Sequence, residues 1–85
     1  MNARTRNNLT HLAEMISTAY QGDDLNLIAI RHDTQAAAND AARDGDNDEA
    51  DALRKILGNS ATPFYASLMG PTGCAQIAQE LTALL

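Results

Sequence analysis

The densest set of side chains that could do chemistry is an acidic run, which places five carboxylates within the eight residues 44–51. Asp44, Asp46 and Asp48 have the alternating spacing of the first three ligands of an EF-hand calcium loop. The sixth position of that loop requires glycine and holds Glu49, and the twelfth requires a bidentate glutamate and holds Lys55. The run therefore fails as a calcium site, and we expect no bound metal.

The same acids have two other interpretations. Acidic side chains are favoured at a helix N-terminus, which accounts for Asp46, Asp48 and Glu49 if a helix begins there. Asp40 and Asp44 fall in the last turn of the preceding predicted helix, where the helix dipole disfavours them. We therefore expect either a solvated surface or an acidic patch that faces a basic partner. The residues of this patch are Asp40, Asp44, Asp48, Glu49 and Asp51.

The segment 70–77 superficially resembles the phosphate-binding loop GxxxxGK[ST]. Ala75 replaces its second glycine, Gln76 its lysine and Ile77 its magnesium-binding hydroxyl. The end of one helix followed by the start of the next explains the segment better.

Metal ligands and nucleophiles are equally sparse. His11 and His32 are 21 residues apart, and neither has the paired spacing of a zinc site with the single cysteine, Cys74. Cys74 shares a helical face with apolar residues, which predicts a small buried side chain. We expect no catalytic residue, no cofactor and no enzyme activity.

The elements that must position these residues are predicted to be helices. The chain has sixteen alanines and neither valine nor tryptophan, a composition that favours helix over sheet. Apolar residues recur at helical spacing in segments 2–20, 23–43, 46–57, 62–69 and 72–84. This pattern predicts an all-α fold, a compact bundle of about five helices in a single domain over residues 1–85.

Helix boundaries are marked by turn and capping residues. Asp23 or Asp24 is the expected cap of the second helix, and Thr62 and Thr72 those of the fourth and fifth. Asp46 with Glu49 three residues later predicts an aspartate-led capping box at the start of the third.

Charge is distributed unevenly along the chain. The formal net charge is −5, yet the last thirty residues contain only one charged side chain, Glu80. This C-terminal third is therefore either a buried helical hairpin or part of an interface. The apolar side chains expected at such an interface are Phe64, Tyr65, Leu68, Met69, Leu81, Leu84 and Leu85.

The cellular location is predicted from sequence features that are missing from the chain. It has neither the roughly 18–20 consecutive apolar residues that a membrane helix needs nor an apolar run after the N-terminal arginines. The lone cysteine excludes an intrachain disulfide. We expect a cytoplasmic protein without a membrane partner.

Three functions fit these observations, and no motif identifies a family. The leading hypothesis is a small acidic binding protein, an inhibitor or regulator that docks on a basic surface, such as the nucleic-acid-binding surface of a partner protein. Small phage-encoded inhibitors, anti-CRISPR proteins among them, are comparable in size and charge. The alternatives are a structural or regulatory homodimer and a transcriptional regulator that contacts DNA through an N-terminal arm containing Arg4 and Arg6. Direct nucleic-acid binding is disfavoured because the last predicted helix has no Arg or Lys.

Overall fold

The fold is all-α, as the composition predicts. The structure is a computed structural model that describes residues 1–21, 27–58 and 61–85, and within these ranges it contains no strand. The helices are α1 (Ala3–Gln21), α2 (Leu27–Arg43), α3 (Asn47–Leu57), α4 (Ala61–Leu68) and α5 (Pro71–Ala83). The caps expected at Asp23 or Asp24 lie outside the described residues. None of the described helices is long and apolar enough to cross a bilayer.

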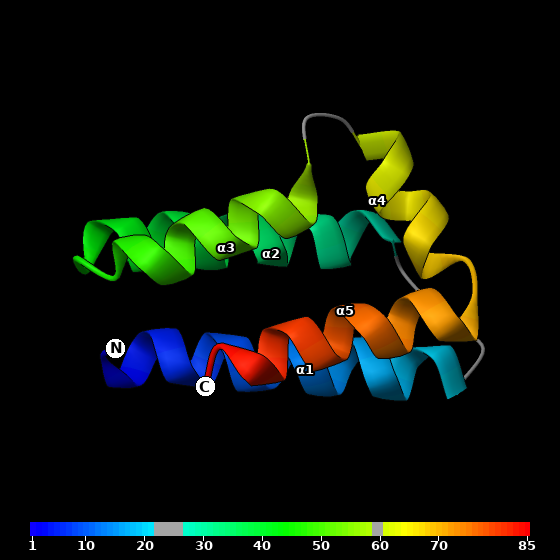
Figure 1. The fold of residues 1–85 in the computed structure, drawn as a ribbon, viewed down its shortest axis with the longest axis horizontal. Helices are drawn as coiled ribbons and strands as arrows, with labels where there is room; N and C mark the ends of the chain where they lie inside the picture. Colours follow the sequence, from blue (N-terminus) through cyan, green and yellow to red (C-terminus); the bar gives the residue numbers. More distant parts are fainter. Residues whose placement is uncertain (22–26, 59–60) are drawn as a thin grey trace.

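The helices form two antiparallel pairs (Figure 1). Helix α1 packs against α5 in one layer, α2 packs against α3 in the other, and α1 also contacts α2 across the layers. The short helix α4 lies across one end, where it contacts α2, α3 and α5. The α2–α3 turn lies at the opposite end.

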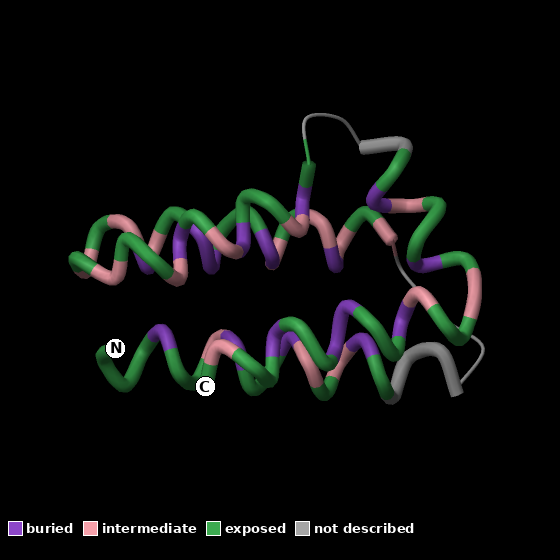
Figure 2. Tube along the Cα trace, viewed as in Figure 1, coloured by how far each residue is buried: buried purple, intermediate pink, exposed green. Residues whose placement is uncertain are grey.

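The core lies between the two layers, where the buried positions of each helix face inward (Figure 2). Its large side chains include Leu9, Leu12 and Ile16 of α1, Leu53 of α3 and Leu81 of α5, each at most 1% exposed. Alanines supply much of the buried surface of α2, namely Ala37, Ala38 and Ala41. Small side chains allow α2 and its neighbours to approach closely, as the alanine-rich second half of this helix predicts.

The turn between α2 and α3 is a Schellman motif. The Gly45 N–H donates to the Ala42 carbonyl, and the Asp46 N–H donates to the Ala41 carbonyl. Gly45 has a φ of 87°, a left-handed conformation that glycine adopts without penalty. Asp46 occupies the N-cap position of α3, but its side chain makes no cap hydrogen bond there. The predicted capping box with Glu49 is therefore wrong, because the Asp46 carboxylate is engaged elsewhere.

Two other helix starts differ from the predicted caps. Helix α4 begins at Ala61, one residue before the expected cap Thr62. Helix α5 begins at Pro71 with Gly70 as its N-cap, so Thr72 already lies within the first turn. Proline is favoured at this first position because its missing N–H would have no partner there.

Helices α4 and α5 approach each other closely at Gly73. A Cβ atom at this position would lie 1.8 Å from the carbonyl oxygen of Ser67, which is a forbidden contact. Next to it, the Cys74 thiol is buried and donates to the Leu68 carbonyl at 3.3 Å. Gly73, one of the two glycines of segment 70–77, thus serves helix packing.

Candidate functional site

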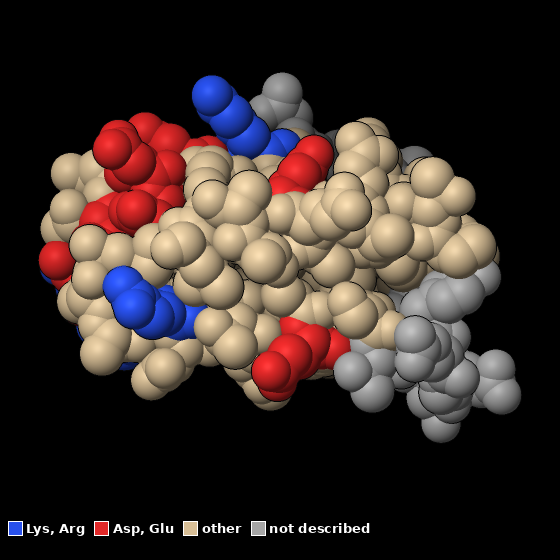
Figure 3. All heavy atoms as spheres, turned by 60° about the horizontal axis from the view of Figure 1, so that its bottom comes forward, with Lys and Arg blue, Asp and Glu red and all other residues tan. Residues whose placement is uncertain are grey.

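Acidic side chains gather at the end of the molecule that carries the α2–α3 turn (Figure 3). Asp40 lies in the last turn of α2 and Asp44 directly follows this helix, whereas Asp48, Glu49 and Asp51 come from the first half of α3. The Schellman turn reverses the chain between them, which places all five predicted patch residues at this end. These five carboxylates differ in their contacts: Asp44 is firmly paired, whereas the other four are less engaged or have no described partner.

Asp44 is held by an arginine of another helix. Arg4 donates from Nε to Asp44 Oδ2 at 2.8 Å and from Nη2 to Oδ1 at 2.5 Å, a bidentate ion pair. The hydrogen bond from Arg4 lowers the pKa of Asp44, and Asp44 in turn raises the pKa of Arg4. The Asp44 side chain is 17% exposed, so little of it remains for a partner.

Asp46 connects the starts of α3 and α1. The Thr5 hydroxyl donates to Asp46 Oδ2 at 2.6 Å, and the backbone N–H of Asn2 donates to the same oxygen at 3.1 Å. The hydrogen bond from Thr5, followed by that from Asn2, lowers the pKa of Asp46. Asn2 also caps α1, since its Oδ1 accepts the Thr5 N–H at 2.8 Å. No local pattern could have revealed that Asp46 reaches Thr5, because the two are 41 residues apart.

The remaining acids of the patch are less engaged. Asp40 lies 3.8 Å from Arg43 one turn later in α2, a weak and partly exposed pair. The carboxylates of Asp48, Glu49 and Asp51 make no ion pair or hydrogen bond with any described residue. Asp48 and Asp51 are exposed and Glu49 is half-buried. The acidic patch that is open to a partner is thus Asp40, Asp48, Glu49 and Asp51.

The fold does not keep the residues of the predicted apolar interface together on one surface, because some are buried and others are exposed. Phe64, Leu68 and Leu81 are at most 2% exposed and form part of the core, so they are not available to a partner. Tyr65 and Leu84 are partly buried against that core. The exposed members, Met69 at 71% and Leu85 at 47%, lie at the ends of α4 and α5. These buried members therefore belong to the core, although the segment is not the covered hairpin of the first alternative, because α5 pairs with α1 and α4 lies across one end of the fold.

An apolar groove of about 410 Å³ lies between α3 and α5 instead. Leu84 is the only described residue of the predicted interface that lines it. Ala52, Ile56 and Ala83 supply the rest of its apolar lining, and Lys55 and Glu80 lie beside them. Sequence reasoning missed this groove because it depends on how α3 and α5 are placed in space, and α4 separates these two helices along the chain.

The residues considered for metal binding and nucleophilic catalysis do not converge. Cys74 is 3% exposed, as its apolar helical face predicts, and burial raises the pKa of its thiol. His32 lies on an exposed surface with Nδ1 3.4 Å from Asp33. Across the described ranges, no three His, Cys, Asp or Glu side chains are grouped to hold a metal ion.

The N-terminal arginines are placed in a helix and not in an extended arm. Helix α1 begins at Ala3, so Arg4 and Arg6 both lie in its first turn. A contact of Arg4 with DNA would compete with its ion pair to Asp44, whereas Arg6 is exposed. That alternative stays a prediction, and the geometry of Arg4 does not favour it.

Comparisons with known proteins add no further constraint. The chain matches no protein-family model, no curated protein and no solved structure. The geometry and charge of its own surface are therefore the basis for proposing a function.

Proposed function

We propose that this protein is a non-enzymatic binding module, an inhibitor or regulator that docks its acidic end on a basic surface of a partner protein. The observation that carries the proposal is the open acidic patch, Asp40, Asp48, Glu49 and Asp51, in which three carboxylates have no partner among the described residues. Complementary charge speeds association and selects partners by sign.

The contacts beside the patch support this role. Arg4 with Asp44, and Thr5 with Asp46, tie the α2–α3 turn to the start of α1. A turn that is held in place loses less conformational freedom when a partner binds, so more of the interaction energy remains as affinity. In this proposal Asp44 and Asp46 position the patch, whereas the open carboxylates make the contacts.

A basic surface that binds nucleic acid normally faces phosphates. A cluster of carboxylates presents the same sign of charge and can compete for the same Arg and Lys side chains. We therefore propose that the partner is a protein with such a surface and that occupancy blocks it.

The test compares two double variants of equal net charge. D48N/D51N neutralises two acids of the open patch, and E14Q/D33N neutralises two acids that lie outside both the patch and the groove between α3 and α5. Each is used as bait, beside the unaltered protein, to capture partners from the native host over a series of salt concentrations. We expect a salt-sensitive partner that is captured by the unaltered protein and the control but not by the patch variant. Equal capture by the patch variant would contradict the proposal.

A homodimer is the second candidate, and the apolar groove between α3 and α5 favours it. Lys55 of α3 and Glu80 of α5 lie at this groove, so a two-fold dimer can place each Lys55 against the Glu80 of its partner. The measurement is the mass in solution by light scattering at high micromolar concentration. A dimer that dissociates on K55E and reforms on K55E/E80K supports this assembly, and a monomer at every concentration contradicts it.

A further inference from the structure

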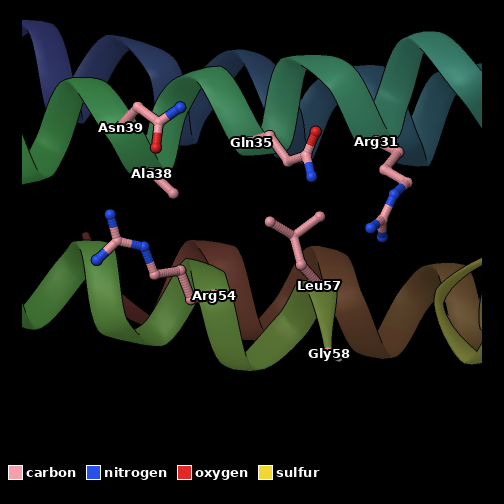
Figure 4. Close-up of a pocket in the computed structure, with 7 residues that line it drawn as sticks. All are labelled: Arg31, Gln35, Ala38, Asn39, Arg54, Leu57 and Gly58. Carbon is pink, nitrogen blue, oxygen red and sulfur yellow. The ribbon is translucent and has the colours of Figure 1, made fainter. Parts of the chain in front are cut away.

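A second groove, of about 370 Å³, lies between α2 and α3 and has the opposite charge to the acidic end (Figure 4). Arg31, Gln35 and Asn39 line it from α2, and Arg54 and Leu57 line it from α3. None of the described residues that line it is Asp or Glu. In a protein with a net charge of −5, this is a local concentration of positive charge and amide groups.

Arg31 is unsatisfied in this groove. Its Nη1 atom is buried and has no hydrogen-bond partner among the residues that the structure describes. Neither Arg31 nor Arg54 forms an ion pair with a described residue. Buried polar groups of proteins are almost always paired, because an unpaired charged donor away from water is costly. An anion in the groove would supply the missing acceptor.

The spacing of the polar groups indicates the shape of that anion. One face of α2 carries polar groups at four-residue intervals, namely Arg31, Gln35 and Asn39. The first and last of these positions are eight residues apart, a rise of about 12 Å along the helix axis. In Figure 4, Arg54 points from α3 toward α2 near Asn39, whereas Arg31 points away from α2 at the C-terminal end of α3, to the right of Leu57. The two guanidinium groups therefore stand at opposite ends of the groove, with the amide of Gln35 between them.

We propose that this groove binds an elongated small molecule that carries an oxyanion group at each end. One phosphate or carboxylate pairs with Arg31 and the other with Arg54, since the planar fork of arginine matches both groups. The side-chain amides of Gln35 and Asn39 bond to the polar part of the ligand between them. This site does not depend on the acidic patch or on its partner.

The experiment is an NMR titration that follows the arginine Nε–H and the Asn and Gln side-chain amide signals. The probes are linear dicarboxylates of increasing length, linear bisphosphates of the same lengths, and acetate and inorganic phosphate as short anions. We expect one length to shift the signals of Arg31, Arg54 and Gln35 together and to bind about tenfold more tightly than the short anions, because two charged contacts replace one. Whichever series binds more tightly, the dicarboxylates or the bisphosphates, shows whether the groove prefers carboxylate or phosphate groups.

Three single variants complete the test. Arg31→Gln and Arg54→Gln should each weaken binding of the matched dianion about tenfold. Arg6→Gln removes the same charge from an exposed position outside the groove and should leave binding unchanged. Arg54 is exposed, so its variant keeps the test valid if the Arg31 variant does not fold. Absence of shifts, dianions that bind no better than short anions, or equal weakening by Arg6→Gln would overturn the proposal.

Discussion

Arg4 in the first turn of α1 and Asp44 just after α2 form a bidentate ion pair across 40 residues of sequence. Thr5 makes a parallel contact with Asp46 at the start of α3. Together they fasten the α2–α3 turn to the opposite layer of the fold. Part of the acidic run therefore has a structural role, because Asp44 and Asp46 hold the turn in place. This role is distinct from the binding role proposed for the open carboxylates.

Removing either member of the Arg4–Asp44 pair should lower the melting temperature. Arg4→Gln and Asp44→Asn each remove the two charge-assisted hydrogen bonds, and we expect the double variant to melt no lower than the less stable single variant. Thermal denaturation of all four proteins completes the double-mutant cycle. Fully additive losses would show that the two side chains do not interact in solution.

Acid should weaken the same contacts. The pKa values of Asp44 and Asp46 are lowered in the folded protein, so these groups add stability above the unfolded-state pKa and lose it as the pH falls below about 4 toward their folded-state pKa. We expect the melting temperature to fall over this range. Asp46→Asn should flatten this fall, and its difference from the unaltered protein should vanish at low pH. A constant difference across the range would contradict this assignment.

Gly73 should tolerate no side chain. Gly73→Ala would force α4 and α5 apart at the Ser67 carbonyl, and we expect a loss of about 1–3 kcal/mol in the free energy of unfolding. Gly70→Ser is the control, because a Cβ at this N-cap meets no atom of the described residues within 4 Å and serine is a good capping residue. Urea denaturation measures both. Equal stability of the two variants would argue against the close approach of the helices.

Leu81 and Leu85, two of the three leucines near the end of α5, should differ sharply in their contribution to stability. Leu81 is 0% exposed, and Leu81→Ala should cost about 2–5 kcal/mol in the free energy of unfolding. Leu85 is 47% exposed, and Leu85→Ala should cost less than about 0.5 kcal/mol. Denaturant unfolding of both variants tests the division of the predicted apolar interface into core and surface. If Leu85→Ala lost a similar amount of unfolding free energy at low protein concentration, Leu85 would belong to the core as well.

Cys74 should be unreactive in the folded protein. Its thiol is buried and its pKa is raised by that burial, so little thiolate is present or accessible near neutral pH. We expect a thiol-specific colorimetric reagent to react only as the chain unfolds in denaturant. Rapid reaction in buffer alone would contradict the burial of this residue.

The helices were predictable from the sequence because their signals are local. Apolar periodicity located α2 and α3, and the glycine at position 45 marked the turn between them. The partner of Asp46 was not predictable, since nothing near this residue distinguishes a capping carboxylate from one that reaches across the fold to Thr5. The capping box pattern favoured the wrong alternative for that reason.

The candidate sites were less predictable than the fold. A shortage of charge in the last thirty residues fits a buried helix and an interface equally well, and only the packing of α5 on α1 assigns Leu81 to the core. The arginines of the second groove, Arg31 and Arg54, are 23 positions apart, and no pattern in the sequence links them. Their approach depends on the antiparallel pairing of α2 with α3, which periodicity alone does not specify.

The pairing of the first helix with the last has a consequence for how the chain folds. Helices α2 and α3 are joined by a tight turn and can associate as soon as each is formed, whereas α1 and α5 must meet across the whole of the intervening chain. Closing a long loop costs entropy before any packing energy is recovered. We therefore expect the α2–α3 hairpin to form early and the docking of α5 on α1 to limit the folding rate. Protection of α1 and α5 amides should then lag behind that of α2 and α3 during refolding.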